Sequence, residues 1–213
     1  WARVLARWEK IFMLASEMKI PVMIDAEESW IQPVVDELAF GFMAKYNTQT
    51  PIVYNTAQLY RHDRLEQLKM ALASAKAEGF IYGVKIVRGA YMEKERKRAE
   101  AKGYTDPIQP NKAATDRDYN AALELILSNL EHMAVVVGTH NEASIELAAT
   151  LMTKHSIAFD SQRVYVAQLF GMSDHISFNA ANSGLNVAKY LPFGPVKDVL
   201  PYLFRRAEEN TAV

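Results

Sequence analysis

Short apolar runs alternate with segments of helical periodicity along this chain, and this alternation constrains the fold more than any other feature. Strand–helix alternation at this spacing is typical of βαβ units and a parallel sheet. A further stretch of helical propensity covers residues 202–210 near the C-terminus. The predicted strands are residues 21–24, 51–54, 81–87, 134–138, 164–167 and 188–191, and the predicted helices are residues 1–19, 31–46, 59–79, 116–132 and 142–155.

Two α/β architectures fit this alternation, a doubly wound open sheet and a (β/α)8 TIM-type barrel. No Gly-x-Gly-x-x-Gly sequence follows the first predicted strand, which weakens a dinucleotide-binding open sheet. A barrel places its functional residues at the carboxyl ends of many different strands, and here polar residues follow the first five predicted strands and a tyrosine closes the sixth. These residues are Asp25, Glu27, Glu28, Gln58, Arg88, Tyr91, Thr139, His140, Asn141, Gln168 and Tyr190.

The barrel is therefore the expected fold, but the count of strands falls short. A closed barrel needs eight strands and typically about 250 residues, whereas six strands are readable in these 213 residues. We expect residues 1–213 to form one catalytic barrel domain, its C-terminal three-quarters, from which the first two strands are missing.

Composition excludes several classes of function. The chain has 24 basic and 25 acidic residues, so its charge gives no reason to expect a nucleic-acid partner. It has no cysteine, which excludes disulfides, thiolate metal ligands and a cysteine nucleophile. The five histidines are scattered without the spacing of metal ligands, so no metal site is predicted.

Adjacent arginines, Arg205 and Arg206, stand out in the C-terminal helical stretch. Guanidinium groups bind carboxylates through bidentate, charge-assisted hydrogen bonds, so two of them can hold one carboxylate from two sides. Glu209 follows Arg206 by three residues and can brace it on the same helix. The alternative is a solvated basic pair near a helix end.

The third predicted strand carries two basic residues and ends at a glycine. Lys85 and Val87 share one strand face and Ile86 and Arg88 the other. In a barrel one of the two basic side chains is interior, where its charge needs a partner such as an anionic cofactor. Gly89 allows a ligand to approach the backbone. The alternative is a charge at the sheet edge followed by a turn glycine.

Two further polar groups have open interpretations. Residues 139–141 lie between a strand and a predicted helix, where they can bind an anion or simply cap the helix. The acids Asp25, Glu27 and Glu28 can bind a metal, balance a cationic substrate or, for Glu27 or Glu28, cap the next helix.

Taken in order, these motifs resemble the proline dehydrogenase family, in its monofunctional or mitochondrial-type branch, and the resemblance covers essentially the whole chain. Several motifs in the right order are more specific than any one alone. The resembling segments are residues 24–28, 57–60, 85–91, 95–99, 103–108, 139–141, 168–172, 190–194 and 205–210.

The resemblance implies a distorted (β/α)8 barrel that holds FAD. Such an oxidoreductase oxidises L-proline to Δ1-pyrroline-5-carboxylate, the first step of proline catabolism to glutamate, and passes the electrons to a quinone. It implies peripheral membrane contact, either from the bacterial cytoplasm at the inner membrane or at the mitochondrial inner membrane and matrix.

For the substrate, the resemblance implies that Arg205 and Arg206 hold the proline carboxylate and that Glu209 orients one of them. Tyr190 packs over the substrate ring, and Tyr91 is a second aromatic contact. Asp25 matches an acid near a substrate-binding lysine that has no counterpart in this chain. The residues assigned to catalysis are Lys85, Tyr190, Arg205 and Arg206.

For the flavin end of FAD, the resemblance implies that Gln58 contacts the flavin edge. Lys85 stands near the flavin N5, where many bacterial members have an arginine. Val87, Gly89 and Ala90 line the isoalloxazine ring.

For the other end of FAD, Thr139, His140 and Asn141 match contacts to the phosphates and the ribitol. Gln168 and Leu169 match residues near the adenosine.

Three alternatives remain at this point. A small residue at the position of Tyr190 would make room for a hydroxylated ring, so Tyr190 favours proline over hydroxyproline, yet a hydroxyproline dehydrogenase of the same family is an alternative. Lys85 can instead form a Schiff base in a barrel aldolase. The third alternative is a non-catalytic interaction domain or inactive remnant.

Overall fold

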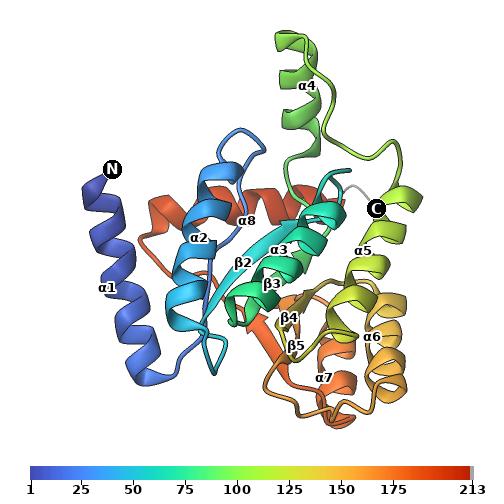
Figure 1. The fold of residues 1–213 in the computed structure, drawn as a ribbon. Helices are drawn as coiled ribbons and strands as arrows, with labels where there is room; N and C mark the ends of the chain where they lie inside the picture. The colour runs from blue at the N-terminus through green and yellow to red at the C-terminus, as the bar shows by residue number, and fades with distance from the viewer. Residues whose placement is uncertain (212–213) are drawn as a thin grey trace.

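A computed structural model describes residues 1–211, with side chains through Phe204. It contains six strands and eight helices that alternate along most of the chain (Figure 1). The strands are β1 (Val22–Met23), β2 (Val53–Gln58), β3 (Tyr82–Val87), β4 (Met133–Gly138), β5 (Val164–Leu169) and β6 (Val187–Tyr190). The helices are α1 (Ala2–Met18), α2 (Gln32–Tyr46), α3 (Arg64–Glu78), α4 (Met92–Lys102), α5 (Lys112–Leu127), α6 (Glu142–Lys154), α7 (Asp174–Asn182) and α8 (Val196–Thr211).

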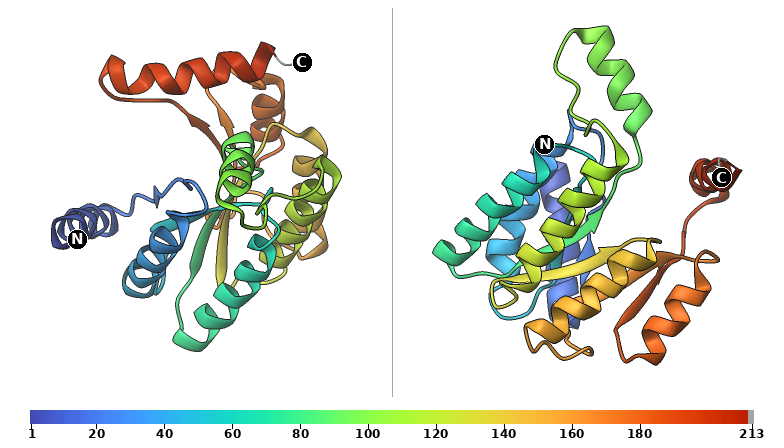
Figure 2. Two further views of the ribbon diagram at one scale, coloured as in Figure 1. Left: turned by 90° about the horizontal axis from the view of Figure 1, so that it is seen from above. Right: turned by 90° about the vertical axis from the view of Figure 1, so that its right-hand side faces the viewer.

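All six strands form one parallel sheet whose spatial order is the sequence order, β1-β2-β3-β4-β5-β6. A doubly wound sheet reverses its strand order at a switch point, so sequential order rules against that alternative. The sheet curls, with most helices on its convex side, and α1 and α8 lie apart across its open side (Figure 2). The described residues therefore form a six-stranded curled half-barrel, which agrees with the six strands predicted from the sequence, and a closed eight-stranded barrel is not seen among them.

The main hydrophobic core lies between the convex face of the sheet and the helices. On β3, Tyr82, Val84 and Ile86 belong to this core. The concave face carries a much smaller apolar cluster that includes Tyr54 and Val136. Because the helices of this core pack on the convex face, few apolar side chains are buried on the concave face.

Two boundaries predicted from the sequence are wrong around β2. The strand extends through Gln58 instead of ending at Tyr54, and the helix that follows starts at Arg64 instead of residue 59. The strand was predicted too short because its second half contains polar residues, which are typical of loops. In the structure Asn55, Thr56 and Gln58 are only 2–4% exposed and make hydrogen bonds inside the protein.

Helices α4 and α7 are absent from the sequence-based prediction. Only Glu95 and Ala99 are buried in α4, which projects from the half-barrel, so it has no apolar stripe to reveal it (Figure 1). The buried Glu95 carboxylate instead accepts hydrogen bonds from the backbone N–H and hydroxyl of Ser29. Helix α7 has nine residues, which is short for a periodicity signal.

Among the residues that the structure describes, no helix combines the length and apolarity needed to cross a membrane.

An ion cluster fixes the start of α3. Asp63 lies 2.6 Å from the Arg61 guanidinium and 2.9 Å from that of Arg64. Burial raises the pKa of Asp63, but hydrogen bonds from Arg64 and Arg61 outweigh it and lower that pKa to about 2. Because the pKa is lower in the folded than in the unfolded chain, the stabilisation is present above the unfolded value and is lost as pH falls.

We expect Asp63→Asn to remove this acid dependence. In the parent protein the cluster should contribute about 1–2 kcal/mol at neutral pH, after allowance for partial exposure, and should lose it between about pH 5 and pH 2. Urea unfolding of both proteins across this range measures the difference. Equal pH slopes for the two proteins would contradict the assignment.

Candidate active site

A row of small side chains crosses the concave face near the carboxyl end of the sheet. Gln58 pairs with Val87, Gly138 pairs with Ala167, and Ala167 pairs with Ala188 across neighbouring parallel strands. A Cβ added at Gly138 would lie 2.9 Å from the Val87 Cγ1, so these two positions are also neighbours. Because it contains a glycine and two alanines, this row carries little side-chain volume on the concave face.

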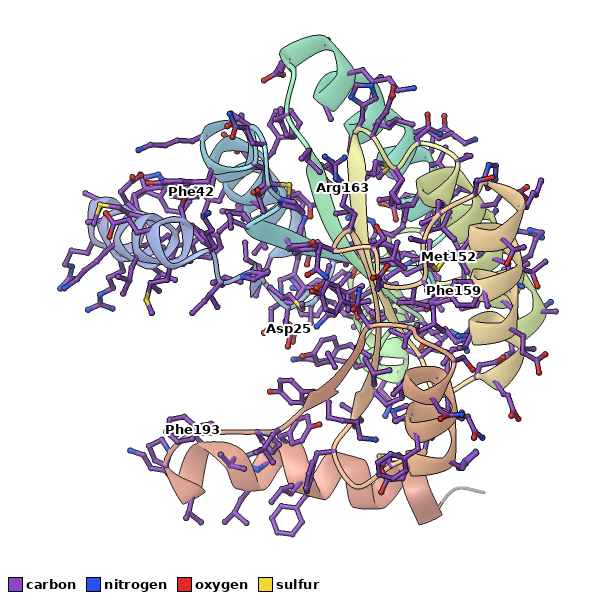
Figure 3. All side chains as sticks on the ribbon, turned by 90° about the horizontal axis from the view of Figure 1, so that it is seen from below. Asp25, Phe42, Met152, Phe159, Arg163 and Phe193 are labelled. Carbon is purple, nitrogen blue, oxygen red and sulfur yellow. The ribbon has the colours of Figure 1, made fainter. Side chains whose placement is uncertain are left out.

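Lys85 lies on the same face of β3, two residues before Val87, and is in register with Thr56 and Val136. Its side chain is 17% exposed and donates a hydrogen bond to the Asp25 carboxylate, which follows β1. The interior basic residue expected on this strand is therefore Lys85, and its charge is paired. Asp25 itself lies on the inner side of the curled sheet (Figure 3).

The loop after β3 is held against two neighbouring segments by Gln58. The Gln58 amide oxygen accepts a hydrogen bond of 3.3 Å from the Ala90 N–H, and its nitrogen donates to the Glu27 carbonyl at 2.8 Å. Gly89 has φ of 140°, and a Cβ there would lie 2.5 Å from the ring of Tyr60. Both polar atoms of Gln58 thus position backbone around the row of small side chains.

The three acids after β1 have three different partners. Asp25 pairs with Lys85, the Tyr91 hydroxyl donates to Glu27 at 3.3 Å, and Lys94 donates to Glu28, which lowers the pKa of the Glu28 carboxyl.

The structure also bears on the helix-capping and metal-binding interpretations of these acids. The helix-capping interpretation is wrong, because the N-cap of α2 is Ile31 and no side chain caps that helix. Across the described residues, no three His, Cys, Asp or Glu side chains gather in a group that could hold a metal ion.

The segment of residues 139–141 leads from β4 into α6. Asn141 is the N-cap of α6, and its side chain accepts a hydrogen bond from the Ser144 N–H at 3.1 Å. Thr139 accepts from the Asn141 N–H at 3.0 Å, and the exposed His140 lies 2.9 Å from the Ser173 hydroxyl. The capping interpretation is confirmed for Asn141, and anion binding at this loop stays a prediction.

The two residues predicted to lie near adenosine point to opposite faces of β5. Gln168 is 2% exposed on the convex side, where it donates to the Thr139 carbonyl at 3.2 Å and accepts from Ser177 at 2.9 Å. Leu169 is on the concave side, in register with Tyr190. The Gln168 side chain therefore braces the loop of Thr139, while Leu169 lines the concave face.

Tyr190 links the sheet to α8. Its ring is 44% exposed and lies 5.4 Å from the ring of Tyr202 in α8, with a tilt of 59°. The segment before α8, which carries Phe193, extends from the sheet along its open side to the start of α8 (Figure 3). The predicted carboxylate clamp falls further along α8, and the side chains of Arg205, Arg206 and Glu209 lie outside the described residues.

The sequence could not have revealed all of these contacts. Asp25 and Lys85 are 60 residues apart, and Gly138, Ala167 and Ala188 carry no functional groups. Their common level on one face depends on strand register, which no local pattern encodes.

Comparison with known proteins identifies relatives along the whole chain. The family described as Proline dehydrogenase matches residues 2–213. Human "Proline dehydrogenase 1, mitochondrial" is 40% identical over 99% of this chain and 36% of its own length. "Hydroxyproline dehydrogenase" of Xenopus laevis is 40% identical over 97% of this chain and 45% of its own length. The chain thus spans between a third and a half of these two relatives.

Solved structures show the same fold. Proline utilization A (PutA) from Bdellovibrio bacteriovorus, inactivated by N-propargylglycine, superposes with a TM-score of 0.91 at 24% identity. The match covers 99% of this chain and 22% of that protein. The half-barrel described above is therefore a known arrangement, and the sequence match over residues 2–213 shows that this chain belongs to the proline dehydrogenase family.

Proposed function

We propose that this chain carries the catalytic barrel of an FAD-dependent enzyme that oxidises L-proline to Δ1-pyrroline-5-carboxylate and passes the electrons to a quinone. The observation that carries the proposal is the row of small side chains on the concave face, with Lys85 beside it and Gln58 at its end. Family membership and the names of the mitochondrial relatives support the same activity.

The proposed enzyme completes its barrel with two further strands between β1 and β6. In the half-barrel, β1 and β6 are the two edge strands of the sheet, and each is open for pairing with a further strand. The fold resemblance to PutA at a TM-score of 0.91 supports a barrel of this type.

The residues present fit FAD. Val87, Gly89 and Ala90 would line the isoalloxazine ring, Gln58 would contact its edge, and Lys85 would supply positive charge near N5. When bound, the flavin supplies the hydride chemistry, and the protein supplies orientation and electrostatics.

The remaining FAD contacts would come from β4 and β5. Residues 139–141 stand at the N-terminus of α6, a position that favours phosphate groups. Leu169, and Gln168 through the loop of Thr139, would shape the adenosine end.

L-Proline would be held by its carboxylate. Arg205 and Arg206 would bind the carboxylate from α8, Glu209 would orient one guanidinium, and Tyr190 and Tyr91 would contact the ring. Tyr190 contacts Tyr202, and position 206 is one helical turn after Tyr202, which supports a clamp beside the substrate tyrosine. Fixing the carboxylate fixes the ring, and such positioning lowers a barrier by several kcal/mol.

Two assays separate this proposal from its alternatives. The intact protein should contain FAD and should reduce a water-soluble quinone only when L-proline is present. A Schiff-base aldolase would lack the flavin band and would be trapped covalently at Lys85 by borohydride. Flavin-free protein that is also not trapped would support the inactive remnant instead.

The quinone is a membrane component, so we also propose peripheral membrane contact. The names of the mitochondrial relatives support a mitochondrial location if the protein is eukaryotic. Within the proposal, the contact is with the inner membrane, from the matrix in mitochondria or from the cytoplasm in bacteria. Cosedimentation with anionic vesicles, with and without proline, tests this contact.

The hydroxyproline alternative is tested at Tyr190. The Xenopus relative is named for hydroxyproline, but the tyrosine ring fills space that a hydroxylated substrate would need. Tyr190→Ser should lower kcat/KM for L-proline about tenfold through lost ring packing and should raise the relative rate with hydroxyproline. A parent enzyme that prefers hydroxyproline would overturn the assignment of proline.

A further inference from the structure

Arg88 is the first residue after β3, and each of its three guanidinium nitrogens donates a hydrogen bond to a different segment. Its Nε donates to Asp116 at 2.7 Å, its Nη1 to the Thr139 hydroxyl at 2.9 Å, and its Nη2 to the Ser144 hydroxyl at 3.1 Å. The guanidinium carbon lies 4.5 Å from the ring centre of Tyr119. A planar fork that meets three acceptors and stacks on a ring is specific to arginine.

One acceptor of Arg88, the Thr139 hydroxyl, belongs to the loop of residues 139–141 that is predicted to bind the FAD phosphates, and a second, Ser144, lies in the first turn of α6. The Thr139 hydroxyl that receives Arg88 also accepts the N–H of Asn141. On the other side, Gln168 donates a hydrogen bond to the Thr139 carbonyl, and the Asn141 side chain accepts one from the Ser144 N–H. The loop and the first turn of α6 are thereby fixed from both sides, and Arg88 supplies two of the hydrogen bonds.

Arg88 also ties α5 to α6. Asp116, in the first turns of α5, accepts hydrogen bonds from both Arg88 and Lys112. Burial raises the pKa of Asp116, but these bonds outweigh it and lower that pKa, so the carboxylate stays ionised at neutral pH. The N-termini of both helices are therefore linked through one guanidinium.

We propose that Arg88 is a positioning residue that holds residues 139–141 and the first turns of α5 and α6 in place for the phosphate groups of the cofactor. This inference rests on the proposed binding of FAD and concerns how tightly the protein binds it. Arg88 acts through Thr139 and Ser144, and proline is bound elsewhere, from α8.

The dissociation constant of FAD from the intact protein tests this inference. Arg88→Met should raise it about 10- to 100-fold, because hydrogen bonds to a charged group contribute about 1.5–3 kcal/mol and a tenfold change corresponds to about 1.4 kcal/mol. At saturating FAD, the KM for L-proline should stay within about twofold, which matches a role in cofactor binding.

Arg163→Met is the matched control. Arg163 donates from Nη1 to two backbone carbonyls, of Leu130 and Glu131, at 2.7 Å each, near the amino end of β5. Both variants should lower the Tm of the apoprotein, but only Arg88→Met should weaken FAD binding. An unchanged FAD constant in Arg88→Met, or an equal loss in Arg163→Met, would overturn the inference.

Two milder variants keep the test decisive if Arg88→Met does not fold. Arg88→Lys keeps the charge but not the fork, so it should restore only part of the affinity; full restoration would refute the role of the three bonds. Ser144→Ala removes one acceptor and should weaken FAD binding about 3- to 10-fold. Parent protein that binds no FAD would refute the proposed function, whereas parent protein that binds FAD with unchanged variants would refute only this inference.

Discussion

Arg206→Ala is expected to raise the KM for L-proline about 100-fold or more while FAD stays bound. Truncating one partner of a desolvated, hydrogen-bonded charge pair costs about 2–5 kcal/mol, and the proline carboxylate is the only anionic group on the substrate. The flavin contacts proposed above come from β2 to β5, so the cofactor should be retained. Steady-state kinetics and the flavin absorbance of the purified variant measure both outcomes.

Lys197→Ala provides a control on the same helix. Lys197 is exposed near the start of α8, so its loss removes a positive charge from the helix without touching the proposed clamp. The control should leave the KM for proline unchanged. Equal KM values for Arg206→Ala and the parent protein would refute the clamp.

Gly89→Ala is expected to destabilise the fold by about 3 kcal/mol and to abolish tight binding of FAD. Its φ of 140° is unfavourable for any residue with a Cβ, and the added atom would lie 2.5 Å from the Tyr60 ring. Tyr60 is only 4% exposed, so its ring has little room to move away. The β3–α4 loop would have to shift, and the backbone proposed to line the flavin would shift with it.

Gly103→Ala separates backbone strain from the local clash. Gly103 also has positive φ, of 69°, but a Cβ there meets nothing within 4 Å. Its replacement should cost only about 1 kcal/mol and leave FAD affinity unchanged. Denaturant unfolding and FAD titration of the two variants measure the contrast, and equal effects would contradict the importance of Tyr60.

The amino-acid sequence predicted the parallel α/β sheet because its strands are apolar runs separated by amphipathic helices. It failed where burial and polarity disagree. Asn55 and Gln58 are polar letters inside a buried strand, and α4 is a helix without an apolar stripe, anchored through the buried Glu95. Local patterns cannot reveal such elements, because their stability depends on hydrogen bonds to distant segments.

The candidate site was predicted residue by residue but not as an arrangement. The strand pattern indicated that Lys85 or Arg88 faces inward, and only the sheet register shows that it is Lys85. The pairing of Lys85 with Asp25 joins two strand ends far apart in the chain. The role of Gln58 in holding the Ala90 loop likewise depends on tertiary contacts.

We predict that the concave face of this sheet holds a flavin against which L-proline is oxidised at C5. Anaerobic mixing of the oxidised flavoprotein with L-proline, or with proline deuterated at C5, tests it directly by following the flavin absorbance. We predict that L-proline bleaches the flavin in a single turnover and that deuterium at C5 slows the bleaching. A flavin band that L-proline leaves unchanged would contradict this prediction. So would bleaching at equal rates with the two substrates at concentrations that saturate the protein.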